Sequence, residues 1–161
     1  MIRPLVKSDF EILHQYAADP YVLATLADGF LWTIQHPAIY SNLPTYFCIE
    51  ENGEPVGMIC CVPGPEEKSA GAELGYWIGR KWWGKGYATR AVSEVVDKTY
   101  ADIPYVECIY ALPYSNNNAS CRVLEKNGFD FVGRMHRSIA KGDKILDTLI
   151  YERVRKADAP N

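Results

Sequence analysis

The sequence predicts an α+β fold, with about four helices packed on a mixed, mostly antiparallel sheet of about six to seven strands. The first observation is Asn52-Gly53 between two β-rich runs, the strongest short signal for a hairpin. The second is a strand-like run at 72–79 followed by apolar residues at helical spacing over 87–100. The third is a pair of alternating runs, 129–139 and 145–154, which predict two long strands.

The N-terminal third is predicted to be helical after one short strand at residues 2–5. Ser8 and Glu11 form a capping-box pattern for a helix that ends before Asp19-Pro20. Residues 21–43 are aromatic-rich and irregular, and they predict one or two short helices joined by loops. Such a segment suits the wall of a substrate pocket as well as ordinary core packing, and both interpretations stand.

The remaining elements follow the same patterns. A helix over 119–127 ends at Gly128, as expected for a C-terminal glycine. A turn at 141–144 joins the last two strands. The other predicted elements are strands at 46–50, 56–62 and 106–112 and a solvated loop at 63–71.

Length, composition and charge limit the classes of function. A chain of 161 residues with 48% apolar content predicts one domain over 1–155 and a frayed tail over 156–161. A net charge of −3 provides no basic stripe, which argues against a nucleic-acid partner. No apolar run approaches the roughly 20 residues of a membrane span, and no charged-then-apolar leader opens the chain. We expect a cytoplasmic protein without a membrane partner, either a monomer or a homodimer.

The metal-binding residue types show no ligand spacing. The five cysteines form no C-x-x-C pair, and most lie in apolar runs, so they are expected to be core thiols. The three histidines are far apart in the sequence. We therefore expect no metal site and no disulfide framework.

A glycine-containing segment, Trp-Trp-Gly-Lys-Gly-Tyr-Ala at 82–88, joins the predicted central strand to the helix after it. Gly84 and Gly86 fall in the turn and the first helical turn of this prediction. The start of a helix offers unpaired N–H groups and a partial positive charge, which favour phosphate. A loop that only turns the chain is the alternative. The spacing matches neither a P-loop nor a dinucleotide fingerprint.

Two stretches together carry a family resemblance. Residues 84–88 are followed by 117–129, which read N-x-x-S-x-R-V-L-E-K-x-G-F. In this order the two stretches resemble the GNAT superfamily of acyl-CoA-dependent N-acetyltransferases, in particular its ribosomal-protein-alanine acetyltransferase branch. The opening residues 2–5 and Ser8-Asp9 also fit that branch, so the resemblance covers nearly the whole chain. It implies a GNAT-like fold with a V-shaped cleft beside the central strand.

The resemblance implies acetyl-CoA as cosubstrate and a primary amine as acceptor, on a protein N-terminus or a small molecule. The pyrophosphate would lie on N–H groups of 82–88, with Arg80, Lys81 and Lys85 nearby, although Lys81 stands where relatives usually carry Gln or Arg. The pantetheine arm would pair with the central strand. Asn117 matches the family asparagine that bonds the arm, with a helix cap as the alternative. The implied cofactor-binding residues are Trp77, Ile78, Gly79, Trp82, Trp83, Gly84, Lys85, Gly86, Tyr87, Ala88 and Asn117.

Direct attack of an amine on the thioester needs a proton acceptor and a proton donor. Glu73, on the central strand, is the candidate general base; a solvent-facing or salt-bridged carboxylate is the alternative, and its face depends on whether the strand has a bulge. Leu124 stands where many relatives carry the tyrosine that protonates the thiolate. The candidate acids are therefore Ser120, Tyr114 or Tyr110, unless the thiolate leaves without one. Ser120 is alternatively a helix cap.

Two other classes of function remain open. An acyl-CoA-binding regulator would keep the cofactor cleft without turnover, and Leu124 favours it. A structural or interaction domain would bind no CoA. In the enzyme interpretation, residues 21–43 and the hairpin around Gly142 build most of the acceptor pocket.

Overall fold

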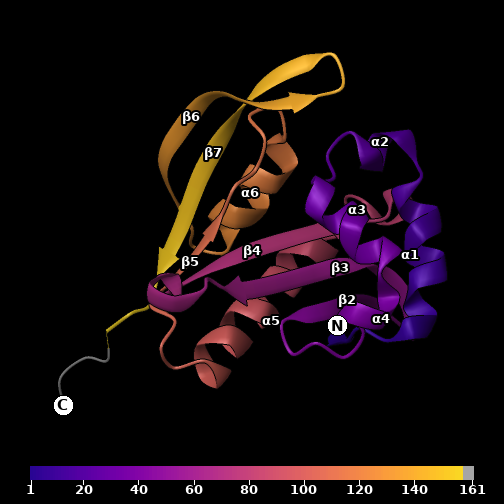
Figure 1. The fold of residues 1–161 in the computed structure, drawn as a ribbon, viewed down its shortest axis with the longest axis horizontal. Helices are drawn as coiled ribbons and strands as arrows, with labels where there is room; N and C mark the ends of the chain where they lie inside the picture. The colour runs from indigo at the N-terminus through magenta and orange to yellow at the C-terminus, as the bar shows by residue number, and fades with distance from the viewer. Residues whose placement is uncertain (158–161) are drawn as a thin grey trace.

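A computed structural model describes residues 1–157, apart from the side chain of Trp32. Its seven-stranded sheet has the order β1-β2-β3-β4-β5-β7-β6 (Figure 1). Paired neighbours are antiparallel except β4 and β5, which are parallel and joined through helix α5. The α+β prediction with one crossover is confirmed. Of the predicted tail, residues 158–161 lie outside the described residues. The strands are β1 (Ile2–Pro4), β2 (Tyr46–Glu51), β3 (Glu54–Pro63), β4 (Gly71–Ile78), β5 (Cys108–Ala111), β6 (Asp130–Lys141) and β7 (Lys144–Val154).

The described residues contain six α-helices, where the sequence predicted about four. The difference lies in the irregular segment after Asp19. Pro20 and Pro37 each open a helix of four residues, which is too short for a periodic pattern. The Asp19 carboxylate caps the first of these by accepting from Tyr21 N–H at 2.9 Å. The helices are α1 (Phe10–Ala17), α2 (Pro20–Leu23), α3 (Asp28–Gln35), α4 (Pro37–Tyr40), α5 (Tyr87–Asp102) and α6 (Asn118–Lys126).

No side-chain cap bond forms at the start of α1, so the predicted Ser8–Glu11 capping box is not realised. The cap lies instead on the 3-10 turn Lys7–Asp9 before α1, where the Asp9 carboxylate accepts from Val6 N–H at 2.9 Å. The same carboxylate forms a bidentate ion pair with Arg3 on β1, at 2.8 Å for each bond. The start of the helical region is therefore tied to the edge of the sheet.

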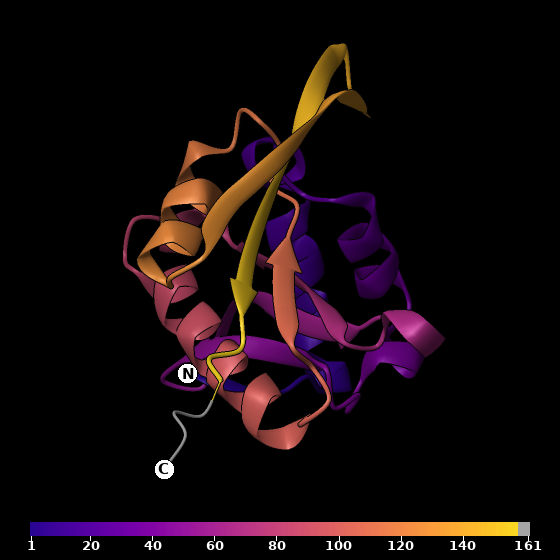
Figure 2. The ribbon, with the colours of Figure 1, turned by 90° about the vertical axis from the view of Figure 1, so that its left-hand side faces the viewer.

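The sheet is covered on both faces. In Figure 2, α5 and α6 lie on one side of β5 and β7, and the N-terminal helices lie on the other. One core joins Leu74 and Ile78 of β4 to α5 and α6, and a second joins Trp77 to α1, α2 and α3. Side chains alternate along a strand, and the β3–β4 register runs without a shift. Glu73 therefore lies on the same face of β4 as Trp77, toward the N-terminal helices. No bulge in the β3–β4 pairing changes this face.

Strands β4 and β5 separate soon after they begin. They pair only from Gly71 with Cys108 to Glu73 with Tyr110, and β4 then continues to Ile78 without β5 beside it (Figure 1). The predicted V-shaped cleft beside the central strand is thus formed by the free edge of β4. Its peptide groups are available to a ligand that can pair like a strand.

Other turns follow the sequence signals. Asn52 and Gly53 have φ angles of 50° and 81°, the left-handed conformation that a tight hairpin turn requires. No helix within residues 1–157 is both long and apolar enough to span a bilayer.

Candidate functional site

The glycine loop, residues 82–88, leads from the end of β4 into the start of α5. Gly84 and Gly86 have φ angles of 73° and 80°, and a Cβ on either would meet no atom within 4 Å. Conformation, not crowding, therefore explains both glycines. Gly86 is the residue before α5 rather than part of its first turn, and its carbonyl accepts from Arg90 N–H at 3.1 Å. The first N–H groups of α5 have no acceptor in the helix and can bind an anion.

The three cations of this region differ in how they are paired. Arg80 stacks on the Tyr21 ring at 3.7 Å, and its guanidinium is 3.7 Å from the Asp19 carboxylate. Lys81 forms a 2.7 Å ion pair with Glu54. Lys85 lies 5.0 Å from the Trp82 ring centre. Since carboxylates already offset Arg80 and Lys81, Lys85 is the cation best suited to an added phosphate.

The free edge of β4 presents alternate peptide groups to the cleft. Gly79 N–H donates to the Val56 carbonyl at 2.8 Å, so Gly79 faces β3. Because peptide groups alternate along a strand, Ile78 faces the cleft, as does Tyr76 two residues before it. The Ile78 carbonyl accepts a 2.8 Å hydrogen bond from the indole N–H of Trp83. Of the predicted contacts at 77–79, Ile78 is therefore the one whose peptide group faces the opening.

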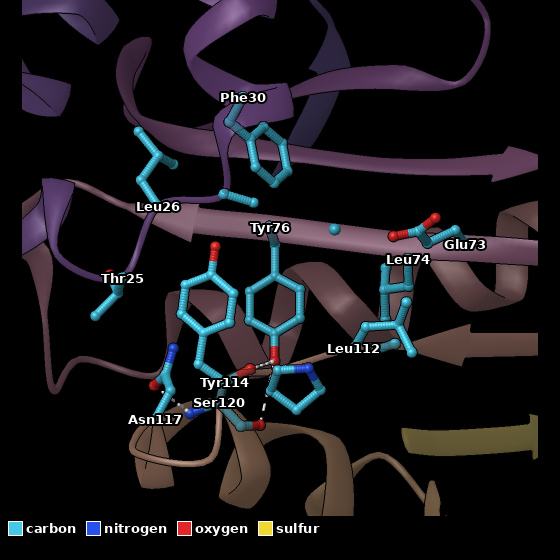
Figure 3. Close-up of a pocket in the computed structure, with 14 residues that line it drawn as sticks. Thr25, Leu26, Phe30, Glu73, Leu74, Tyr76, Leu112, Tyr114, Asn117 and Ser120 are labelled. Carbon is cyan, nitrogen blue, oxygen red and sulfur yellow. Dashed lines mark hydrogen bonds between the residues drawn. The ribbon is translucent and has the colours of Figure 1, made fainter. Parts of the chain in front are cut away.

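A cavity lies beside this edge (Figure 3). Four residues that the sequence singled out meet there: Glu73 from β4, Tyr114 after β5, Asn117 before α6, and Ser120 in α6. The opposite wall comes from the α2–α3 connection and α3, as expected for residues 21–43. The residues that line the cavity are Thr25, Leu26, Ala27, Phe30, Glu73, Leu74, Gly75, Tyr76, Ala111, Leu112, Pro113, Tyr114, Asn117 and Ser120.

Gly75 in β4 and Gly79 directly after it let the N-terminal helices approach. A Cβ at Gly75 would lie 2.8 Å from the Phe30 ring, and one at Gly79 would lie 2.8 Å from the Tyr16 ring. Because these distances are shorter than real contacts, only glycine lets each ring lie directly on the strand. Phe30 thereby forms an aromatic wall above β4 (Figure 3).

Ser120 is held by two neighbours. Its N–H donates to the Asn117 side-chain oxygen at 3.1 Å, so Asn117 caps α6 and Ser120 does not. Its Oγ lies 2.8 Å from the Tyr76 hydroxyl, which also lies within 3.2 Å of the Ser120 carbonyl. Burial raises the pKa of Tyr76, which keeps this phenol protonated at neutral pH. Figure 3 shows the Asn117 amide nitrogen directed away from the cap, toward the cavity.

Sequence reasoning missed Tyr76. The signal available was its position on the central strand, on the opposite face from Glu73. The Tyr76 hydroxyl reaches Ser120 only because α6 lies against that face of β4. The residue pattern of β4 alone does not reveal this packing.

Glu73 is exposed, and its carboxylate has no hydrogen-bond or ion-pair partner among the side chains that the structure describes. The salt-bridged alternative is therefore not realised in the described structure. Its neighbours on the same face are weak acids: burial raises the pKa of Tyr46 to about 12, and the Glu73 charge adds to that shift. Burial and then Glu73 likewise raise the pKa of Tyr110, which lies opposite Glu73 on β5. Glu73 thus lies as an exposed side chain beside two phenols whose pKa values are raised.

The other acid candidates are placed differently. Burial raises the pKa of Tyr114, whose hydroxyl points into the cavity toward Leu26 and Phe30 (Figure 3). Tyr110 lies outside the cavity lining. Leu124 is fully buried in the core with α5, so an apolar side chain occupies the position of the relatives' tyrosine. Within residues 1–157, no group of three or more His, Cys, Asp or Glu side chains is arranged to hold a metal ion.

Comparisons with known proteins agree with this geometry. The sequence profile of the acetyltransferase (GNAT) domain matches residues 1–130. Over 165 residues the chain is 21% identical to an uncharacterized N-acetyltransferase, p20, of Bacillus licheniformis, covering 96% of this chain and 92% of that protein.

Solved structures share the fold at low sequence identity. A GNAT-family acetyltransferase from Bacillus anthracis superposes with a TM-score of 0.80 at 23% identity, covering 95% of this chain and 93% of that one. RimL, a ribosomal L7/L12 alpha-N-protein acetyltransferase in complex with coenzyme A, gives a TM-score of 0.80 at 20% identity, covering 98% and 94%.

Proposed function

The chain belongs to the acetyltransferase (GNAT) domain family, and from that premise we propose that it transfers an acetyl group from acetyl-CoA to a primary amine. One observation carries the proposal: the free edge of β4 runs between the glycine loop and a cavity that contains Glu73 and Ser120. Donor and acceptor could meet there. We further propose that residues 1–155 act as one unit in the cytoplasm, as a monomer or homodimer without nucleic-acid or membrane partners.

The chain's own groups fit acetyl-CoA at three points. N–H groups from Gly84 to Ala88, with Lys85, would hold the pyrophosphate. The peptide groups of Tyr76 and Ile78 would pair with the pantetheine arm as a neighbouring strand does. The Asn117 amide nitrogen, directed into the cavity, would donate to the same arm. The carrier supplies the activated acetyl group as a thioester.

Glu73 would take the proton from the attacking amine, directly or through one water molecule. A peptide α-amine titrates at about 7.7–8.0 and a lysine amine at about 10.4, so the base has less to do for an N-terminal acceptor. The nitrogen–carbon bond forms and the carbon–sulfur bond breaks. Ile78 N–H would polarise the thioester carbonyl from the cleft side of β4.

The leaving thiolate requires a proton, and Ser120 is the leading donor. Its hydroxyl lines the cavity and is held by Tyr76 and Asn117. Tyr114 is the other candidate, since its hydroxyl also points into the cavity. Amide and free thiol are then the products. Glu73 would release the amine's proton to solvent and Ser120 would regain a proton from solvent, which returns both side chains to their starting states.

One observation favours a second function. Leu124 supplies no proton donor at the position of the relatives' tyrosine, which suits an acyl-CoA-binding regulatory domain without turnover. The two functions share the cofactor site and differ only in chemistry.

Release of free thiol from acetyl-CoA separates them. The protein would be assayed with N-terminal peptides and small primary amines, and release should depend on the amine. The Glu73→Gln variant should lose about 100-fold or more in kcat while binding acetyl-CoA normally. A Glu67→Gln variant, which changes an exposed carboxylate of the β3–β4 connection, is the matched control. Normal acetyl-CoA binding without amine-dependent release would favour the regulatory function.

A further inference from the structure

We propose, on the basis of the proposed function, that the acceptor site selects amines with no carboxylate near the reacting nitrogen. Free amino acids would thus be poor acceptors, and amines flanked by amide or methylene groups would be good ones. The starting point is the lining of the cavity. Among the described residues that form it, Glu73 is the single charged side chain, and none is a lysine, arginine or histidine.

The two charges just outside the cavity form an ion pair and leave that asymmetry in place. Asp28 follows the Thr25–Ala27 wall, and its charge adds to burial in raising the pKa of Tyr114. Lys141 reaches the same wall from the β6–β7 turn, but its ammonium donates to the Leu26 carbonyl at 2.7 Å and lies 3.6 Å from the Asp28 carboxylate. Its charge is therefore offset before an acceptor arrives.

A carboxylate on the acceptor would be destabilised in the cavity in two ways. It would lose water without gaining a counter-ion, and it would repel Glu73 across the short span that base catalysis requires. Neutral groups avoid both effects, because Phe30 and Tyr114 offer aromatic surface. The Tyr114 hydroxyl also has no hydrogen-bond partner among the described side chains. Placing two like charges side by side costs several kcal/mol, so kcat/KM for a carboxylate-bearing amine should be lower by about 100-fold or more.

Matched amines test the inference without naming the natural acceptor. Butylamine and 4-aminobutyrate ionise at the amine at nearly the same pH and differ by a terminal carboxylate. Alaninamide and alanine form a second pair, compared per unit of neutral amine. With saturating acetyl-CoA, thiol release should give kcat/KM values about 100-fold higher for the uncharged member of each pair.

The outcomes are distinguishable. Equal rates within a pair, or faster reaction of the carboxylate, would overturn the selectivity and leave the acetyltransferase function intact. If acetyl-CoA binds and no amine in an extended panel of peptides and amines is acetylated, the proposed function fails, and the selectivity fails with it.

Adding a cation to the cavity wall should reduce the preference, in kcat/KM, for the uncharged amine over the carboxylate-bearing one. Thr25→Arg adds a cation at the cavity wall, and Thr25→Gln is the neutral control; both lose the hydroxyl that donates to the Val22 carbonyl at 3.0 Å. The arginine variant should react with the carboxylate-bearing amine, relative to butylamine, at least about 10-fold more efficiently than the glutamine variant does. Asp28→Lys against Asp28→Asn repeats the test at an exposed residue if Thr25→Arg does not fold. Unchanged ratios in both comparisons would contradict the proposal.

Discussion

The indole N–H of Trp83 donates a 2.8 Å hydrogen bond to the backbone carbonyl of Ile78. This bond links the glycine loop to the free edge of β4, because Trp83 precedes Gly84 and the Ile78 carbonyl faces the cleft. Trp83 is 44% exposed. Its indole N–H is bonded to the Ile78 carbonyl oxygen, which is the acceptor that a pantetheine arm paired like a strand would use. Binding of the arm and the Trp83 bond would compete for one carbonyl oxygen.

The Trp83→Phe variant keeps an aromatic ring and removes the donor. If the arm pairs with Ile78, the variant should bind CoA about 3- to 10-fold more tightly, since one neutral hydrogen bond no longer has to be broken. Trp82→Phe is the control, because the Trp82 indole donates to the Tyr16 hydroxyl instead. Calorimetric dissociation constants for the two variants give the answer; unchanged or weaker binding by Trp83→Phe would contradict the competition.

Gly86→Asp should abolish measurable CoA binding, because it adds a negative charge at the anion site and a side chain at φ 80°. The strain alone costs about 1 kcal/mol. Gly142→Ala, at φ 61° in the β6–β7 turn, should show similar strain without a binding defect. Thermal unfolding and CoA titration of both variants separate strain from charge. Normal CoA binding by a folded Gly86→Asp protein would remove the glycine loop from the cofactor site.

Tyr76→Phe and Ser120→Ala should each lower kcat and leave the KM for acetyl-CoA nearly unchanged. Because Tyr76 is proposed to act through Ser120, at 2.8 Å, the double variant should be no slower than Ser120→Ala. The pH profile of kcat supplies a readout that a packing defect would not shift. Additive losses would show that the two hydroxyls act independently.

Alkaline pH should destabilise the fold through its buried thiols. Burial raises the pKa of Cys48 from 9.0 to about 12. A raised folded pKa means that this contribution is complete below about pH 9 and is lost as pH rises from there to about 12, by up to about 1.4 kcal/mol per pH unit. Denaturant unfolding of Cys48→Ala should therefore show a shallower decline over that window. A buried control without a thiol, Val96→Ala, should keep the wild-type slope; equal slopes in both variants would contradict the assignment.

The parts of the site that were predictable are those with a local signal. Gly84 and Gly86 between a strand and a helix predict an anion-binding turn, and both prove to have positive φ. Asn52-Gly53 predicts the hairpin because both residue types accept the positive φ that a tight turn requires, and both have positive φ in the structure. Helix periodicity identified α5, and the glycine at 128 marked the end of α6; the predicted bounds of both are close to those observed.

The parts that escaped prediction depend on contacts between distant segments. The helices opened by Pro20 and Pro37 are too short for periodicity, and tertiary contacts stabilise them. Val22 of α2 is buried in the core formed with α1 and α3, and the Tyr40 ring of α4 lies 4.9 Å from the Tyr46 ring of β2. The partnership of Tyr76 with Ser120 needs α6 beside β4, and Lys141 reaches Leu26 across most of the chain. A pattern of neighbours in sequence carries no information about such pairs.

Titration of the purified protein with acetyl-CoA in a calorimeter tests the central claim most directly, with free CoA and ATP as comparison ligands. The account predicts saturable binding in the micromolar range, about −8 kcal/mol, for acetyl-CoA and CoA and much weaker binding for ATP. A folded sample that binds none of the three, or binds ATP as well as acetyl-CoA, would contradict the cofactor site along the free edge of β4.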